Sequence, residues 1–154
     1  MTPHIELRQA QESDRALAQE AHHAAYQEVV ERQFGVWDES AQDRFFLAEW
    51  NPSKQEVIVV DGQSCGYWVV ERRAADFHLR ELVIHPRFQG RGVGTWLVRR
   101  LQREATAAGL PVRLGTFHTN RAAVLYRRLG FEEIGSTDTH VLMEWRPELG
   151  AAAS

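Results

Sequence analysis

The sequence has only one cysteine and one lysine in 154 residues. A single cysteine, Cys65, excludes an internal disulfide and every metal site built from several thiolates. Cys65 lies in the strand-like segment SCGYWVV, so we interpret it as a small buried hydrophobe rather than a reactive thiol. Because Lys54 is the only lysine, no lysine follows a glycine-rich segment, which excludes a P-loop nucleotide site.

Long apolar runs and an excess of positive charge are also missing. No segment approaches the roughly 18 consecutive apolar residues of a membrane span, and residues 1–14 do not resemble a secretion signal, so we expect a cytoplasmic protein with no membrane partner. The net charge of −3 argues against a nucleic-acid partner, which requires a concentrated positive surface. The seven histidines show no HExxH or comparable spacing, so we expect no metal site.

What the sequence does contain is enough apolar material for one domain. With 44% hydrophobic residues, we expect a single domain over residues 1–148 and a disordered tail over residues 149–154. Charge is unevenly divided, because residues 1–76 carry 7 basic and 14 acidic side chains and residues 77–154 carry 11 and 7. This division suits a site that holds an anionic cofactor with its C-terminal half and a cationic group near its N-terminal half.

Hydrophobic periodicity and turn residues predict the order β-α-α-β-β-β-α-β-α-β-β. Asp38 is expected to cap the second helix, and Asp61-Gly62 to form a tight hairpin turn. Interleaved helices and strands place the chain in the mixed α/β class, with a sheet that is antiparallel at least in part. Strands are predicted at 4–10, 56–60, 65–73, 77–85, 111–117, 131–135 and 140–145, and helices at 14–32, 39–51, 92–108 and 120–130.

The glycine-rich segment QGRGVG lies between a predicted strand and a predicted long helix. Its glycines are evenly spaced and no acidic residue ends the next strand, so it does not match a dinucleotide-binding fingerprint. Such glycines let the main chain approach phosphate oxygens, and the amides that open the helix attract anions. The segment therefore predicts a diphosphate site, with charge from Arg87 and Arg91 and a hydrogen bond from Gln89. A purely architectural turn is the alternative.

Two stretches resemble a known family. LRELVIHPRFQGRGVGTWLV is similar to the central acyl-CoA-binding motif of the GNAT N-acetyltransferase superfamily, and NRAAVLYRRLGF is similar to its next motif. Together they span residues 79–131, and the predicted element order matches the family over almost the whole chain. The resemblance implies a GNAT fold, with a twisted, mostly antiparallel central sheet, one splayed parallel strand pair and about four flanking helices.

The resemblance also implies an activity, that of an acyltransferase. We expect an acetyl-CoA-dependent N-acetyltransferase that acetylates a primary amine, by direct attack in a ternary complex and with a small molecule as acceptor. The alternatives are acetylation of protein lysines or N-termini, and a non-catalytic module that binds acyl-CoA. The last strands mediate dimers in many members, so a homodimer is one arrangement that the resemblance allows.

The family motifs carry over to particular residues. Backbone groups of the strand before the glycines contact the pantetheine arm in the family and polarise the thioester carbonyl. The positions implied to bind acetyl-CoA are Leu82, Val83, Ile84, Arg87, Gln89, Gly90, Arg91, Gly92, Val93, Gly94, Thr95, Asn120 and Tyr126.

The resemblance assigns Tyr126 as the general acid for the thiolate of coenzyme A, with a core tyrosine as the alternative. Asn120 is a pantetheine contact, a helix cap, or both. The general base is left open between Glu81 and His78, which a regular strand would place on opposite faces unless a bulge intervenes. Either residue could instead lie at the surface or at a sheet edge, and Glu81 could recognise the ammonium group of the acceptor.

Aromatic and acidic residues cluster near the two N-terminal helices, which line the acceptor pocket in GNAT folds. An aromatic pocket with an acidic rim would suit a cationic small molecule, although we favour core packing as the role of most of these aromatics. The residues concerned are Phe34, Trp37 and Trp50, with Glu31, Asp38 and Glu39 at the rim.

Overall fold

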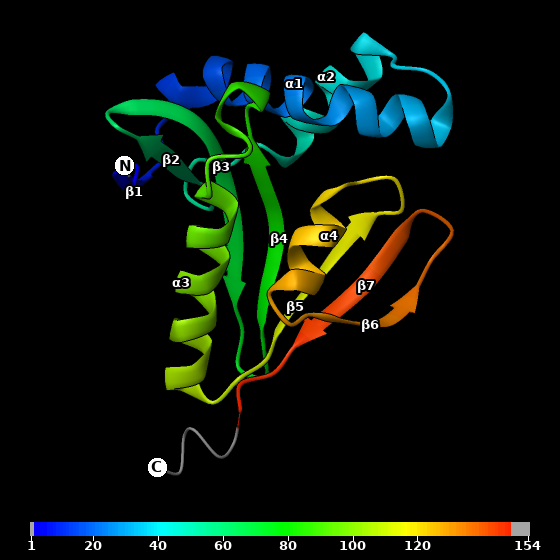
Figure 1. Ribbon diagram of the computed structural model, residues 1–154. Helices are drawn as coiled ribbons and strands as arrows, with labels where there is room; N and C mark the ends of the chain where they lie inside the picture. Colours follow the sequence, from blue (N-terminus) through cyan, green and yellow to red (C-terminus); the bar gives the residue numbers. More distant parts are fainter. Residues whose placement is uncertain (1, 149–154) are drawn as a thin grey trace. The chain divides into compact units, whose positions relative to one another are not determined.

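The computed structural model describes residues 2–148 and contains the elements in the predicted order (Figure 1). The strands are β1 (Ile5–Gln9), β2 (Glu56–Val60), β3 (Gln63–Arg72), β4 (Phe77–Ile84), β5 (Val112–Phe117), β6 (Glu132–Ser136) and β7 (His140–Trp145). The helices are α1 (Arg15–Phe34), α2 (Glu39–Glu49), α3 (Val93–Ala108) and α4 (Ala122–Arg128), with short 3-10 turns η1 (Glu12–Asp14) and η2 (Pro86–Phe88).

The strands form one seven-stranded sheet in the order β1-β2-β3-β4-β5-β7-β6. Among the described pairings, β4 with β5 is the parallel one, and it aligns Phe77 with Val112 and Leu79 with Leu114. This ladder ends at Leu79, whereas β4 continues to Ile84. The arrangement confirms the predicted GNAT fold, including the single parallel pair in a mostly antiparallel sheet.

The described residues divide into two compact units. Unit 1 comprises residues 2–69 and 81–93, and unit 2 comprises residues 70–80 and 94–148. The single domain predicted for residues 1–148 stays a prediction, and the tail predicted for 149–154 lies outside the described residues.

Unit 1 is built from α1, α2, strands β1 to β3 up to Val69, and the last part of β4. Asp38 caps α2 as predicted, because its carboxylate accepts a hydrogen bond from the Ala41 amide at 3.1 Å. The hairpin turn between β2 and β3 has positive φ at both Asp61 and Gly62, also as predicted. Buried side chains from both helices and from strands β3 and β4 form a core cluster: Ala18, Ala21, Phe46, Tyr67, Val69 and Val83.

Unit 2 contains most of α3, with β5, α4, β6 and β7. The apolar stripe predicted on α3 is fully buried, since Leu97, Val98, Leu101 and Ala105 are each at most 1% exposed. β5 pairs with β7, and Val112 and Met143 are buried on these two strands. None of the described helices is both long and apolar enough to span a bilayer.

Candidate active site

The glycine-rich segment forms an exposed loop between η2 and α3. Gly90 and Gly92 have φ values of 76° and 83°, and a Cβ at either position would meet no atom within 4 Å. The left-handed backbone at both positions therefore favours glycine. Arg91 between them does not have positive φ, so the sign of φ alternates along residues 90–92. Alternation of this kind turns successive amides toward one concave side of a loop.

Two side chains hold this loop against the end of β4. Gln89 donates from Nε2 to the carbonyl oxygen of Ile84 at 2.8 Å. His85 accepts a hydrogen bond at Nδ1 from the Arg87 amide at 3.1 Å, which closes η2. The sequence predicted a phosphate contact for Gln89, and the structure adds a role in shaping the loop.

The two loop arginines are exposed. The Arg91 guanidinium carbon lies 5.3 Å from the centre of the buried Phe88 ring, which restrains that side chain near the loop. At the start of α3, Val93 is buried while Gly94 and Thr95 are half-buried. The first amides of a helix have no intrahelical acceptor and lie at the positive end of the helix dipole. Exposed backbone donors and guanidinium groups together suit a diphosphate.

Residues 82–84, whose backbone was predicted to bind the pantetheine arm, occupy the last three positions of β4. Val83 is buried, and Leu82 and Ile84 are half-buried. Sequence reasoning missed the partner of this segment, Gly66 on β3. A Cβ on Gly66 would lie 1.9 Å from the carbonyl oxygen of Val83, so only glycine permits this approach.

An irregularity in the neighbouring ladder accompanies this close approach. The pairing of β2 with β3 shifts register between Ile58 and Val59, so that Cys65 is the extra residue of a bulge. The Cys65 carbonyl accepts a hydrogen bond from the His85 amide at 2.8 Å. The thiol itself is buried as predicted, and this burial raises the pKa of Cys65 to about 11.

Glu81 lies in unit 1 and is oriented by a buried tyrosine. The Tyr67 hydroxyl donates a hydrogen bond to Glu81 Oε1, and Tyr67 is only 1% exposed. Burial, with the nearby Glu81 carboxylate, raises the pKa of Tyr67 far above its ordinary value, so the phenol stays protonated and keeps donating. The sequence offered no signal for this pair, because 14 residues separate its members.

His78, the alternative base, lies in unit 2 opposite Arg113 in the β4–β5 ladder. Burial lowers the pKa of His78, with Arg73 contributing, and its Nδ1 atom is buried without a hydrogen-bond partner. Its surroundings are a network of ion pairs. The buried carboxylate of Asp76 accepts from Arg73 Nε at 2.7 Å and from Arg113 Nη1 at 3.1 Å.

Within unit 2, Asn120 precedes α4 and Tyr126 lies within that helix. Asn120 Oδ1 accepts a hydrogen bond from the Ala122 amide at 2.9 Å, which supports the start of the helix. The Tyr126 ring is 5% exposed and packs against Phe131, with ring centres 5.6 Å apart. Burial raises the pKa of Tyr126 above its ordinary value, so its hydroxyl holds its proton at neutral pH.

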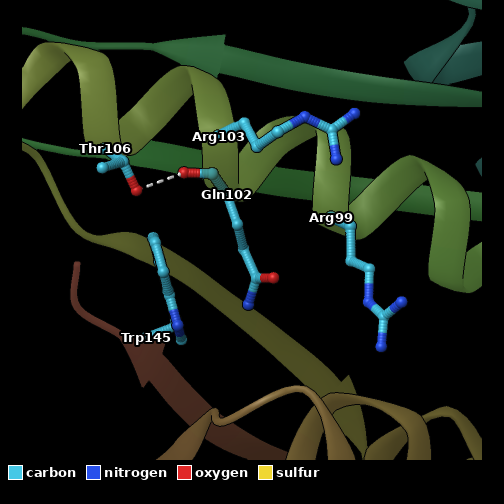
Figure 2. Close-up of a pocket in the computed structure, with 5 residues that line it drawn as sticks. All are labelled: Arg99, Gln102, Arg103, Thr106 and Trp145. Carbon is cyan, nitrogen blue, oxygen red and sulfur yellow. Dashed lines mark hydrogen bonds between the residues drawn. The ribbon is translucent and has the colours of Figure 1, made fainter. Parts of the chain in front are cut away.

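Unit 2 also contains an open groove of about 390 Å³ lined by Arg99, Gln102, Arg103, Thr106 and Trp145 (Figure 2). Gln102 is already engaged there, because its Nε2 donates to the Leu129 carbonyl at 2.8 Å. Figure 2 shows the two guanidinium groups pointing in different directions from α3. The groove contains none of the predicted site residues.

Comparison with known proteins decides the family. The model of the acetyltransferase (GNAT) domain matches residues 41–133, which is more than half of the chain. The chain belongs to the GNAT acetyltransferase family. This assignment confirms the family resemblance and the enzyme class predicted from the sequence, an acyltransferase.

Two curated relatives of this GNAT chain are acetyltransferases. It is 33% identical over 96 residues to an uncharacterized N-acetyltransferase of Methanocaldococcus jannaschii, covering 60% of this chain and 40% of the relative. It is 39% identical over 85 residues to a GCN5-like protein acetyltransferase of Mycobacterium tuberculosis, covering 52% of this chain and 41% of the relative. The matches thus span about two fifths of the length of these relatives.

Solved structures share the fold at low identity. The PaiA N-acetyltransferase of Thermoplasma acidophilum, solved in complex with coenzyme A, has a TM-score of 0.75 at 15% identity and covers 94% of this chain and 99% of its own. An acetyltransferase of Thermus thermophilus has a TM-score of 0.68 at 18% identity, with 93% and 97% covered. These likenesses support the GNAT fold independently of the family motifs.

Proposed function

We propose that this protein is an acetyl-CoA-dependent N-acetyltransferase that acetylates the primary amine of a small molecule. The observation that carries the proposal is the loop at Gly90 and Gly92, whose left-handed residues lead into the start of α3 inside the segment matched by the family model. Its exposed donors and two arginines fit an anionic diphosphate. The coenzyme A complex of the Thermoplasma relative adds support for this cofactor.

The proposed binding residues divide by what they offer. The loop residues 87–95 bind the diphosphate through backbone amides and guanidinium groups. Leu82, Val83 and Ile84 offer backbone groups to the pantetheine arm, because the ladder to β5 ends at Leu79. Asn120 is assigned a pantetheine contact from the family motif, and this role is compatible with the hydrogen bond that its Oδ1 accepts.

Acetyl-CoA supplies an acetyl thioester, and two side chains of the protein transfer protons, one as an acceptor and one as a donor. Glu81 takes the proton of the acceptor ammonium, directly or through water, so that the neutral nitrogen can attack the thioester carbonyl. As the amide bond forms and the carbon–sulfur bond breaks, the nitrogen releases its second proton to solvent, which also restores the proton that Tyr126 gives up. We prefer Glu81 to His78 because Tyr67 orients its carboxylate. Tyr126 gives its hydroxyl proton to the departing thiolate, and its burial keeps that proton in place beforehand.

The choice of a small amine rests on charge. Glu31, Asp38 and Glu39 are exposed around the connection between α1 and α2, where they attract a cationic acceptor. A protein acceptor is the second candidate, because one curated relative is named a protein acetyltransferase.

The test is thiol release from acetyl-CoA with a panel of small amines, lysine peptides and N-terminal peptides. We expect turnover on small amines, a loss of kcat of about 100-fold in Glu81→Gln, and kcat within about twofold of wild type in His78→Gln. Tyr126→Phe should also slow release while leaving the Kd for coenzyme A nearly unchanged. A folded protein that binds no acetyl-CoA and turns over no amine would refute the proposal, and faster turnover of peptides would favour the second candidate.

A further inference from the structure

One imidazole and two carboxylates come together where α1 meets α2 in unit 1. His23 lies on α1, and Glu39 and Asp43 lie one turn apart on α2, so both carboxylates project from the same side of that helix. His23 Nε2 lies 2.7 Å from Asp43 Oδ1 and 4.0 Å from Glu39 Oε1. One nitrogen and two oxygens thus lie within 4.8 Å of one another.

The two distances from His23 Nε2 to the carboxylate oxygens lie on either side of the distance between neighbouring ligand atoms in a zinc site. Bonds of about 2.0–2.1 Å in a tetrahedron place neighbouring ligand atoms about 3.3 Å apart, between the two distances observed. Zn²⁺ and similar first-row metals accept imidazole nitrogen together with carboxylate oxygen, whereas Ca²⁺ and Mg²⁺ prefer oxygen alone. Three protein ligands would leave further positions for water.

Each of the three side chains is held by a partner from outside the group. His22 Nδ1 lies 2.9 Å from His23 Nδ1, Gln19 donates to Asp43 Oδ1 at 2.8 Å, and Trp37 donates to Glu39 Oε2 at 2.5 Å. Such outer hydrogen bonds are what orient the ligands of protein metal sites. When the shared hydrogen sits on His23 Nδ1, the lone pair of His23 Nε2 faces the two carboxylates.

Burial and a third ligand distinguish this group from an ordinary surface ion pair. The His23 side chain is 14% exposed, while those of Glu39 and Asp43 are 67% and 41% exposed, so the imidazole is fixed and solvent can deliver an ion. His4 and Glu6 lie equally close, at 2.7 Å, but they are 73% and 62% exposed, and no third ligand joins them among residues 2–148. That pair provides a matched control.

We propose that His23, Glu39 and Asp43 bind a divalent first-row transition metal, with Zn²⁺ the best fit, and that the ion links α1 to α2. Histidine spacing along the sequence predicted no metal site, because the ligands come from two helices. The proposal does not depend on acetyl transfer.

The test uses untagged protein freed of metal with a chelator. Calorimetry with Zn²⁺ should show one ion per chain and a rise in Tm, Co²⁺ should develop visible absorption, and Ca²⁺ should bind about 100-fold more weakly than Zn²⁺. Equal affinity for Ca²⁺ and Zn²⁺ would overturn the proposal, as would the absence of Zn²⁺ binding at about 100 µM.

Variants locate the site. Glu39→Gln, Asp43→Asn and His23→Gln should each weaken Zn²⁺ binding by about tenfold or more, and His4→Gln should leave it unchanged. Glu39 is exposed, so its variant keeps the test valid if His23→Gln fails to fold. Wild-type Zn²⁺ affinity in Glu39→Gln and Asp43→Asn would show that the ion binds elsewhere and would overturn the assignment.

Discussion

The two ends of β4 are built in opposite ways. At the Phe77–Leu79 end, the strand pairs with β5 and the neighbouring charges satisfy one another, with Asp76 held by Arg73 and Arg113. At the Glu81–Ile84 end, the strand leaves that ladder, passes close to Gly66 and runs into an exposed glycine loop. Mutually satisfied charges stabilise a fold, whereas an oriented carboxylate and exposed backbone donors are available to a ligand.

The same contrast separates the two titratable residues of this strand. Glu81 receives a hydrogen bond from a buried phenol, while the buried Nδ1 atom of His78 has no partner. Orientation is what proton transfer requires, so the loop end of β4 is the end to which we assign chemistry.

The largest expected effect is that of Gly66→Ala. The new Cβ would lie 1.9 Å from the Val83 carbonyl oxygen, so the backbone must move, at a cost of about 3 kcal/mol in the free energy of unfolding. Gly135→Ala is the matched control, since its Cβ would meet only the flexible end of Leu142 at 3.7 Å. Urea denaturation measures the free energy of unfolding of both variants. Equal values would contradict the close approach of Gly66 to the Val83 carbonyl oxygen.

An intermediate effect is expected at the other end of the strand. Hydrogen bonds from Arg73 hold the pKa of Asp76 below its ordinary value, so this carboxylate stabilises the fold above the unfolded pKa of about 3.9 and loses that contribution as the pH falls through the lower folded value. Asp76→Asn should lower Tm at pH 6 much more than at pH 3, while the Kd for coenzyme A stays unchanged. Thermal melts at both pH values measure this, and an equal loss of Tm at both would contradict it.

Gly92→Ala should have the smallest effect on stability, together with a specific effect on coenzyme A binding. A left-handed alanine costs about 1 kcal/mol, and loss of one charge-assisted hydrogen bond should weaken coenzyme A binding about tenfold. Gly109→Ala introduces the same strain at the other end of α3, with φ of 68° and an equally open surrounding. If calorimetry shows the same loss of affinity in both variants, strain rather than ligand contact explains the loop glycines.

Features that depend on local sequence were predictable. Asp38 before α2, Asp-Gly at the hairpin and the apolar stripe of α3 each reflect interactions within a few residues. The glycine loop between β4 and α3 was predicted as well, and the positive φ of Gly90 and Gly92 adds a conformational reason for its glycines. The resemblance to GNAT motifs supplied the rest of the proposed site.

Features that depend on distant residues were not predictable from one sequence. Tyr67 reaches Glu81 only after β3 and β4 have formed, and the same folding places Gly66 against Val83. His23 meets Asp43 only where two helices pack. The homodimer, the absence of a nucleic-acid partner and the cytoplasmic location stay predictions.

The most direct measurement is a ¹⁵N-resolved NMR titration of the backbone amides with coenzyme A. The proposed diphosphate site predicts that the largest shifts fall on the amides of residues 90–95, with smaller shifts for residues 82–84. Saturable binding that leaves the amides of residues 90–95 unmoved would contradict the proposal that this loop binds the cofactor.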